Sequence, residues 1–153
     1  SEFLSIFGNV FEKTESVALK VFELKPFKDS DDIVSKMLKI YEEYDRDKIL
    51  QILNSHPELA IEKKLTNESK LEQTSANLNE CSEEEFEEFK KLNLEYKTKF
   101  GFPFIIAVKG KNKNEILVNF RERIQNDLNK EFLEAKNQVK KIASFRLKDI
   151  LSF

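Results

Sequence analysis

Glycine and proline each occur only three times among the 153 residues, and tryptophan is absent. Turn-rich β domains use both residues at their many chain reversals. Their scarcity therefore argues against such a fold. The glycines (Gly8, Gly101 and Gly110) are also scattered, so the chain has no glycine-rich loop of the kind that binds phosphate groups.

The chain contains one cysteine, Cys81, and one histidine, His56. A single cysteine excludes a disulfide framework and, with no visible signal peptide, predicts a reducing, cytoplasmic location. A zinc site built from histidine and cysteine lacks ligands, so no metal is expected. Any nucleophile–histidine arrangement must use His56, and no G-x-S-x-G motif supplies its serine. The sequence therefore predicts chemistry without a cofactor.

Neither sign of charge dominates, because 26 basic and 28 acidic residues give a net charge of −2. Neither nucleic acid nor a membrane surface is therefore an expected partner. No apolar run approaches the ~20 residues of a membrane-spanning helix. Hydrophobic residues make up 40% of the chain and charged residues 35%, which predicts one globular domain over residues 1–153.

Apolar residues recur with helical spacing along nearly the whole chain, which predicts an all-α, single-domain helical bundle. Short helices are expected at 3–7 and 17–22, and a long last helix over 132–150. The other helices are recognised by residues that cap helix ends. These are Ser30, Asp45, Ser82 with Glu85, and Asn112 at helix starts, and Gly101 at a helix end.

The segment 102–108 (FPFIIAV) breaks the helical pattern, since it is apolar, partly β-branched and flanked by Gly101 and Gly110. A lone strand would have no partner, so we expect an extended, partly buried connection between helices. Buried backbone N–H and C=O groups need hydrogen-bond partners. One candidate partner is a bound ligand.

Arg146 lies on the apolar stripe of the last helix, at helical spacing from Val139, Ile142 and Ile150. A buried guanidinium is unfavourable unless it is paired, and its planar fork suits a carboxylate. It could bind an anionic ligand. It could also form an internal pair with a glutamate, or extend its charged end to solvent.

His56 follows a helix that should end near Ser55, because Pro57 disfavours helical backbone in the residue before it. Histidine is the usual acid–base residue near neutral pH, and a rigid chain break can present it to a cleft. The alternative is an ordinary histidine at a helix end.

The segment Ser69 to Gln73 (SKLEQ) matches the S-x-x-E capping box, in which Ser69 and Glu72 cap one helix start. The same helix start could instead direct Ser69, Glu72 and Gln73 toward a polar substrate. The two interpretations do not exclude each other.

Short motifs follow one another along nearly the whole chain. They are FLSIFGNVFE at 3–12, HPELA at 56–60, LTNESKLEQ at 65–73, YKTKFGFPFI at 96–105, VKG at 108–110 and IASFRL at 142–147. Each motif is weak alone, but their ordered combination is specific. Together they resemble the 2-oxo-4-hydroxy-4-carboxy-5-ureidoimidazoline (OHCU) decarboxylase family.

This resemblance implies an all-α homodimer that converts OHCU to (S)-allantoin and CO2 in urate degradation, without a metal or organic cofactor. Carried over by position, His56 is the catalytic acid–base residue and Glu72 its partner. Arg146 binds anionic or carbonyl oxygens of the substrate. The implied substrate-binding residues are Pro57, Ser69, Gln73, Phe102, Phe104, Ile105 and Ile106.

Two features depart from the family pattern. After Glu12 the family usually has Ser-Pro-Trp, where this chain has KTES at 13–16, and the stretch between Ala60 and Leu65 is shorter. Two alternative functions stay open. One is decarboxylation of a different ureido acid, and the other is a non-catalytic helical interaction module of the same fold.

Overall fold

The computed structural model describes residues 2–60 and 65–151. Within these ranges the chain forms α-helices, one short 3-10 helix and no β-strand, so the predicted all-α fold is confirmed. The elements are α1 (Glu2–Phe7), α2 (Ser16–Phe22), α3 (Ser30–Glu43), α4 (Arg46–Asn54), α5 (Asn67–Ser75), the 3-10 helix η1 (Leu78–Glu80), α6 (Glu83–Phe100), α7 (Lys113–Arg123) and α8 (Leu128–Leu151).

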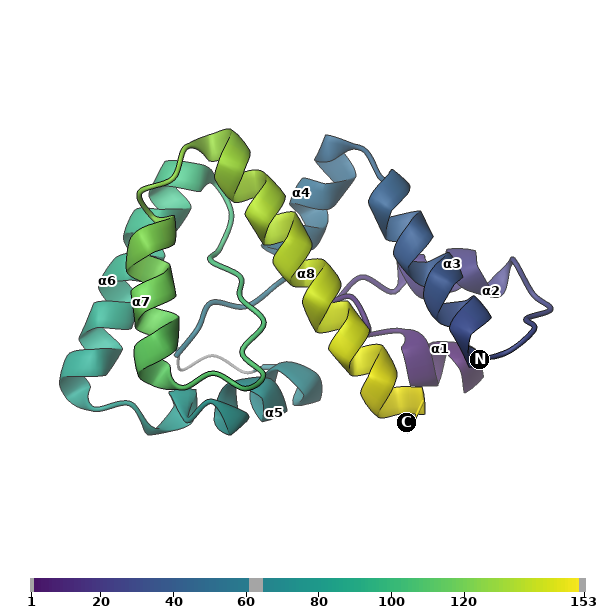
Figure 1. The fold of residues 1–153 in the computed structure, drawn as a ribbon, viewed down its shortest axis with the longest axis horizontal. Coiled ribbons are helices and arrows are strands. Elements are labelled where there is room, and N and C mark those ends of the chain that lie inside the picture. Colours follow the sequence, from purple (N-terminus) through teal and green to yellow (C-terminus); the bar gives the residue numbers. More distant parts are fainter. Residues whose placement is uncertain (1, 61–64, 152–153) are drawn as a thin grey trace.

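The long helix α8 crosses the middle of the molecule (Figure 1). In this view α1 to α4 lie on one side of it, and α5, α6 and α7 lie on the other. Helix α8 contacts α1, α3, α4 and α6 directly. Its side chains can therefore meet both halves of the molecule.

Local sequence signals account for most helix ends. The side chains of Asp45 and Asn112 each accept a hydrogen bond from the backbone N–H three residues on, as predicted. Ser82 and Glu85 form the predicted capping box at the start of α6. Gly101 ends α6 at φ +80°, a left-handed conformation that glycine adopts without strain.

Two predicted caps are wrong. Helix α3 is capped by Asp29, whose carboxylate accepts from the Asp32 N–H, and Ser30 is already its first helical residue. Helix α5 is capped by Thr66, so Ser69 lies inside the helix and accepts no capping bond. In both cases an oxygen-bearing residue earlier in the chain caps the helix.

The segment 102–108 is neither helix nor strand, as expected, and it packs against a cluster of aromatic rings. Tyr96 of α6 lies 5.4 to 5.9 Å, centroid to centroid, from the rings of Phe102, Phe104 and Phe120. Phe104 also stacks on Phe120 of α7 at 3.9 Å. All four rings are buried, and their contacts hold the segment against α6 and α7.

Within 2–60 and 65–151, no helix combines the length and apolarity needed to cross a membrane. The shorter stretch expected between Ala60 and Leu65 consists of residues 61–64, which lie outside the described ranges.

Candidate active site

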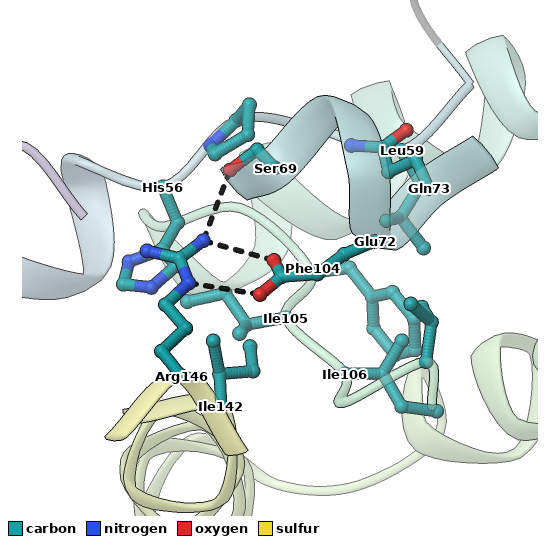
Figure 2. A pocket seen from close by; sticks show the side chains of 12 residues that line it. His56, Leu59, Ser69, Glu72, Gln73, Phe104, Ile105, Ile106, Ile142 and Arg146 are labelled. Atoms are coloured by element: carbon teal, nitrogen blue, oxygen red, sulfur yellow. Dashed lines mark hydrogen bonds and ion pairs between the residues drawn. The ribbon is translucent and has the colours of Figure 1, made fainter. Parts of the chain in front are cut away.

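A pocket lies between the end of α4, helix α5, the segment 104–108 and the C-terminal half of α8 (Figure 2). Its empty volume is about 360 Å³, which includes space open to solvent. Four separate parts of the chain therefore meet there. The lining residues are His56, Pro57, Leu59, Ser69, Glu72, Gln73, Phe104, Ile105, Ile106, Val108, Ile142 and Arg146.

Arg146 is the most highly connected side chain of the pocket, and it is only 5% exposed. Its Nε and Nη2 donate to the two carboxylate oxygens of Glu72 at 2.8 and 2.9 Å. Nη2 also donates to Ser69 Oγ at 3.2 Å, and Figure 2 shows these bonds converging on the guanidinium. Nη1 donates to the Asn9 carbonyl oxygen and to Glu12 Oε1, at 2.9 and 3.1 Å. Arg146 thus has the internal glutamate pair that the sequence analysis left open.

Glu12 is a buried carboxylate that the sequence analysis did not single out, although it ends the first motif. It is 0% exposed. Besides Arg146, it accepts hydrogen bonds from the hydroxyls of Thr66 and Ser69, at 2.8 to 3.0 Å, and from Asn9 Nδ2 at 3.1 Å. Burial by itself would raise the pKa of Glu12. The bonds from Ser69 and Thr66 and the charge of Arg146 outweigh that effect and hold the pKa below its usual value.

His56 is buried just beyond the end of α4, where the helix breaks before Pro57 as predicted. Its Nδ1 lies 3.0 Å from the Ile52 carbonyl oxygen. Because a carbonyl only accepts, Nδ1 carries the proton, and Nε2 of the neutral ring is left as an acceptor. Nε2 has no hydrogen-bond partner among the described residues. The ring lies beside the Arg146 guanidinium (Figure 2).

Burial lowers the pKa of His56 to about 4, and the charge of Arg146 acts in the same direction. The hydrogen bond to Ile52 and the charge of Glu12 oppose this shift without cancelling it. At neutral pH the ring is therefore uncharged, and Nε2 carries no proton.

Helix α5 contributes three of the predicted residues to the pocket. Ser69 and Glu72 lie one turn apart and both contact Arg146, while Gln73 faces the chain that follows His56. Gln73 accepts from the Ala60 N–H at 3.0 Å and donates to the Glu58 carbonyl oxygen at 3.2 Å. Gln73 thereby holds the loop after His56 against the pocket.

Polar side chains of α7 and α8 hold the segment 104–108 in place. Buried Arg123 donates to the Ile105 carbonyl oxygen at 2.7 Å, and Gln138 accepts from the Ala107 N–H at 2.9 Å. Ile105 and Ala107 are two positions apart. In extended backbone, residues two positions apart direct their N–H and C=O groups to the same side. The backbones of Phe104 and Ile106 form no hydrogen bond with any residue in the described ranges. Both residues line the pocket.

The structure brings most predicted site residues together, with two differences. Phe102 is fully buried among aromatic rings and does not line the pocket. Glu72, the expected partner of His56, binds Arg146 instead, whereas His56 is oriented by the Ile52 carbonyl and lies in the field of Glu12. Among the described residues, no group of three or more His, Cys, Asp or Glu side chains is placed to hold a metal ion.

The sequence profile of the OHCU decarboxylase family matches residues 1–148. The chain belongs to this family. It is 40% identical, over 98% of its length, to the uric acid degradation bifunctional protein of Bacillus sp. (strain TB-90), of which it spans 30%. It is 35% identical to the 2-oxo-4-hydroxy-4-carboxy-5-ureidoimidazoline decarboxylase of Haloferax volcanii, over 98% of this chain and 89% of that protein.

A crystal structure of (S)-allantoin synthase has the same fold, with a TM-score of 0.77 and 27% sequence identity over 97% of this chain and 50% of that one. The matched region thus makes up most of the Haloferax protein but less than a third of the Bacillus protein. The motifs that carry the family resemblance contribute His56, Ser69, Glu72, Gln73 and Arg146, and all five line one pocket.

Proposed function

We propose that this chain decarboxylates OHCU to (S)-allantoin and CO2, as a step of urate degradation. The observation that carries the proposal is that one pocket contains both a buried arginine and a neutral histidine. The Nε2 atom of that histidine has no hydrogen-bond partner among the described residues. Relatives named for this reaction align over nearly the whole chain, and a solved structure of the same fold is named for (S)-allantoin synthesis.

Arg146 supplies the positive charge that a carboxylated substrate needs. Its guanidinium binds the carboxylate or a ring carbonyl oxygen, and Ser69 adds a hydroxyl beside it. The free backbone groups of Phe104 and Ile106 face the polar edges of the ring and ureido group, and Pro57, Ile105 and Ile142 supply apolar walls. Gln73 acts indirectly, since its amide holds the loop that follows His56.

The substrate's own structure explains how CO2 can leave. The carboxylate is bonded to a ring carbon that also carries a hydroxyl, next to an unsaturated, nitrogen-containing ring system. When the C–C bond to the carboxylate breaks, its electron pair enters this ring system and CO2 departs. Arg146 keeps the breaking bond aligned with the ring, and His56 Nε2 moves a proton at the hydroxyl or at the ring carbon. Proton delivery from one face produces a single allantoin enantiomer.

Circular dichroism during urate oxidation tests this proposal. Urate oxidase and hydroxyisourate hydrolase generate OHCU in the cuvette, with or without this protein. We expect rapid appearance of optically active (S)-allantoin only when the protein is present. Slow, racemic allantoin in both samples would contradict the activity, and it would favour the non-catalytic module in which the Arg146–Glu72 pair is purely structural.

We also propose that the chain forms a homodimer in the cytoplasm. The support for the dimer is the family resemblance, and the support for the location is the thiol content. The single free thiol of Cys81 is consistent with a reducing compartment. Light scattering on the purified protein should give twice the chain mass. A monomer mass, or recovery of the protein outside the cytoplasm on cell fractionation, would contradict these assignments.

A further inference from the structure

The Arg146 guanidinium is flanked by two carboxylates that differ greatly in burial and in the number of their hydrogen bonds. Glu12 is 0% exposed and accepts bonds from Asn9, Thr66 and Ser69 in addition to Arg146. The Glu72 side chain is 31% exposed. Among the described residues, its carboxylate has no hydrogen-bond partner other than Arg146. Moving Glu12 would break several hydrogen bonds, whereas moving Glu72 breaks only its contacts with Arg146.

The two carboxylates also occupy different edges of the guanidinium. Glu72 takes the Nε–Nη2 edge with two parallel bonds, the geometry that binds a carboxylate most strongly. Glu12 contacts only Nη1, which it shares with the Asn9 carbonyl. The edge best suited to a substrate carboxylate is therefore the one that Glu72 occupies.

The charges of the site oppose the simple addition of an anion. One guanidinium and two carboxylates leave a net negative charge in a largely buried place, because His56 is neutral at pH 7. A third carboxylate would add repulsion that one arginine cannot compensate. An anionic substrate must therefore replace one of the two carboxylates.

Space for a displaced Glu72 side chain exists next to it. Two further hollows, with empty volumes of about 720 and 670 Å³ including open space, are each lined in part by Glu72. The larger one is also lined by Lys109, whose ammonium group attracts a carboxylate, and by Asp149, which repels one.

We propose that Glu12 is a positioning residue that permanently holds Arg146, and that Glu72 is an exchangeable carboxylate that leaves the Nε–Nη2 edge when an anionic substrate binds. This inference rests on the proposed function, because it assumes a carboxylated ureido substrate. It predicts that neutralising the two glutamates has opposite effects on the affinity for an anion.

Calorimetric titration of the full chain can measure these effects without turnover. The probes are allantoate, an anionic ureido acid, and (S)-allantoin, which is uncharged. We expect Glu72→Gln to bind allantoate about tenfold more tightly than wild type, because the competing charge is gone. We expect Glu12→Gln to bind allantoate about tenfold more weakly, because the loss of the ion pair that orients Arg146 outweighs the removal of one negative charge. The affinity for allantoin should change less than about twofold in both variants.

Glu122→Gln is the matched control, because Glu122 is an exposed carboxylate on α7 whose removal changes the net charge equally. Glu12→Asp should retain more of the allantoate affinity than Glu12→Gln, since it keeps the charge. Because Glu72 is partly exposed, we expect Glu72→Gln to fold. The Glu72 measurement therefore tests the exchange even if Glu12→Gln fails to fold.

Equal allantoate affinity of wild type and Glu72→Gln, or no binding to either, would overturn the exchange. Equal losses of allantoate and allantoin binding in Glu12→Gln would reduce Glu12 to a structural residue and overturn its positioning role. The circular dichroism assay on the same wild-type preparation separates these outcomes from failure of the proposed function itself.

Discussion

Replacing His56 with glutamine is expected to lower kcat for OHCU by a factor of about 10² to 10⁴, the usual contribution of a general acid–base group. Glutamine has a similar length and can still bond to the Ile52 carbonyl, but it cannot accept and return a proton. Wild-type His56 can do both, because Nδ1 is held by Ile52 and Nε2 is free. Initial rates of (S)-allantoin formation, followed by circular dichroism, measure the loss.

The same variant has a second readout, in the dependence of stability on pH. The pKa of His56 is about 4 in the folded protein and 6.5 in an unperturbed histidine. As pH falls from 6.5 to 4, the unfolded chain takes up a proton that the folded chain does not. The contribution of the neutral ring to the free energy of unfolding is therefore fully present above pH 6.5. It falls by about 3 kcal/mol as the pH is lowered to 4.

His56→Gln should accordingly show a flatter free energy of unfolding between pH 6.5 and 4 than wild type. Glu12 acts in the same direction at lower pH, because its pKa is below the ordinary 4.5 and its stabilisation disappears as it protonates. Near-normal turnover of a folded His56→Gln protein would exclude His56 as the acid–base residue. A parallel stability profile would contradict its burial as a neutral ring.

Replacing Arg146 with methionine is expected to destabilise the fold by about 3 to 5 kcal/mol and to abolish binding of allantoate. Methionine fills much of the apolar space but leaves the fully buried carboxylate of Glu12 without its cation. Chemical denaturation at pH 7.5 gives the change in the free energy of unfolding, and calorimetry gives the change in affinity.

A second substitution identifies the cause of that loss. In Arg146→Met combined with Glu12→Gln, the uncompensated charge is gone, so the double variant should be more stable than Arg146→Met alone. Arg121→Met is the matched control, because Arg121 binds Glu88 with the same two-bond geometry at the surface, where its side chain is 52% exposed. It should cost at most about 1 kcal/mol. An Arg146→Met protein as stable as that control would contradict a buried, tightly coupled site.

Several parts of this structure could be predicted because the interactions involved are short-range. The caps at Asp45, Ser82 and Asn112 each join residues three positions apart, so the sequence contains both partners. The apolar stripe of α8 placed Arg146 on the inward face by periodicity alone. Pro57 ended α4 beside His56 for a local steric reason.

The errors arose where competing partners were available. At α3, adjacent Asp29 and Ser30 could both cap, and the extended backbone of Asp29 selected the aspartate. At α5, the S-x-x-E pattern was present but unused. Thr66 took the capping role, Ser69 donates to Glu12, and Glu72 binds Arg146. Phe102 shares a motif with Phe104, yet its ring points into the aromatic core.

The sequence by itself determined the helical fold, the family and the polar residues that line the pocket, because periodicity, capping and motif order are properties of neighbouring residues. Only the tertiary structure decided how those residues pair. Glu12, Glu72 and Arg146 come from distant parts of the chain and meet in a largely buried place, where each charge must find a partner. That requirement places the fully buried Glu12 at Nη1 of Arg146 and the partly exposed Glu72 at its Nε–Nη2 edge, an arrangement that no local pattern contains.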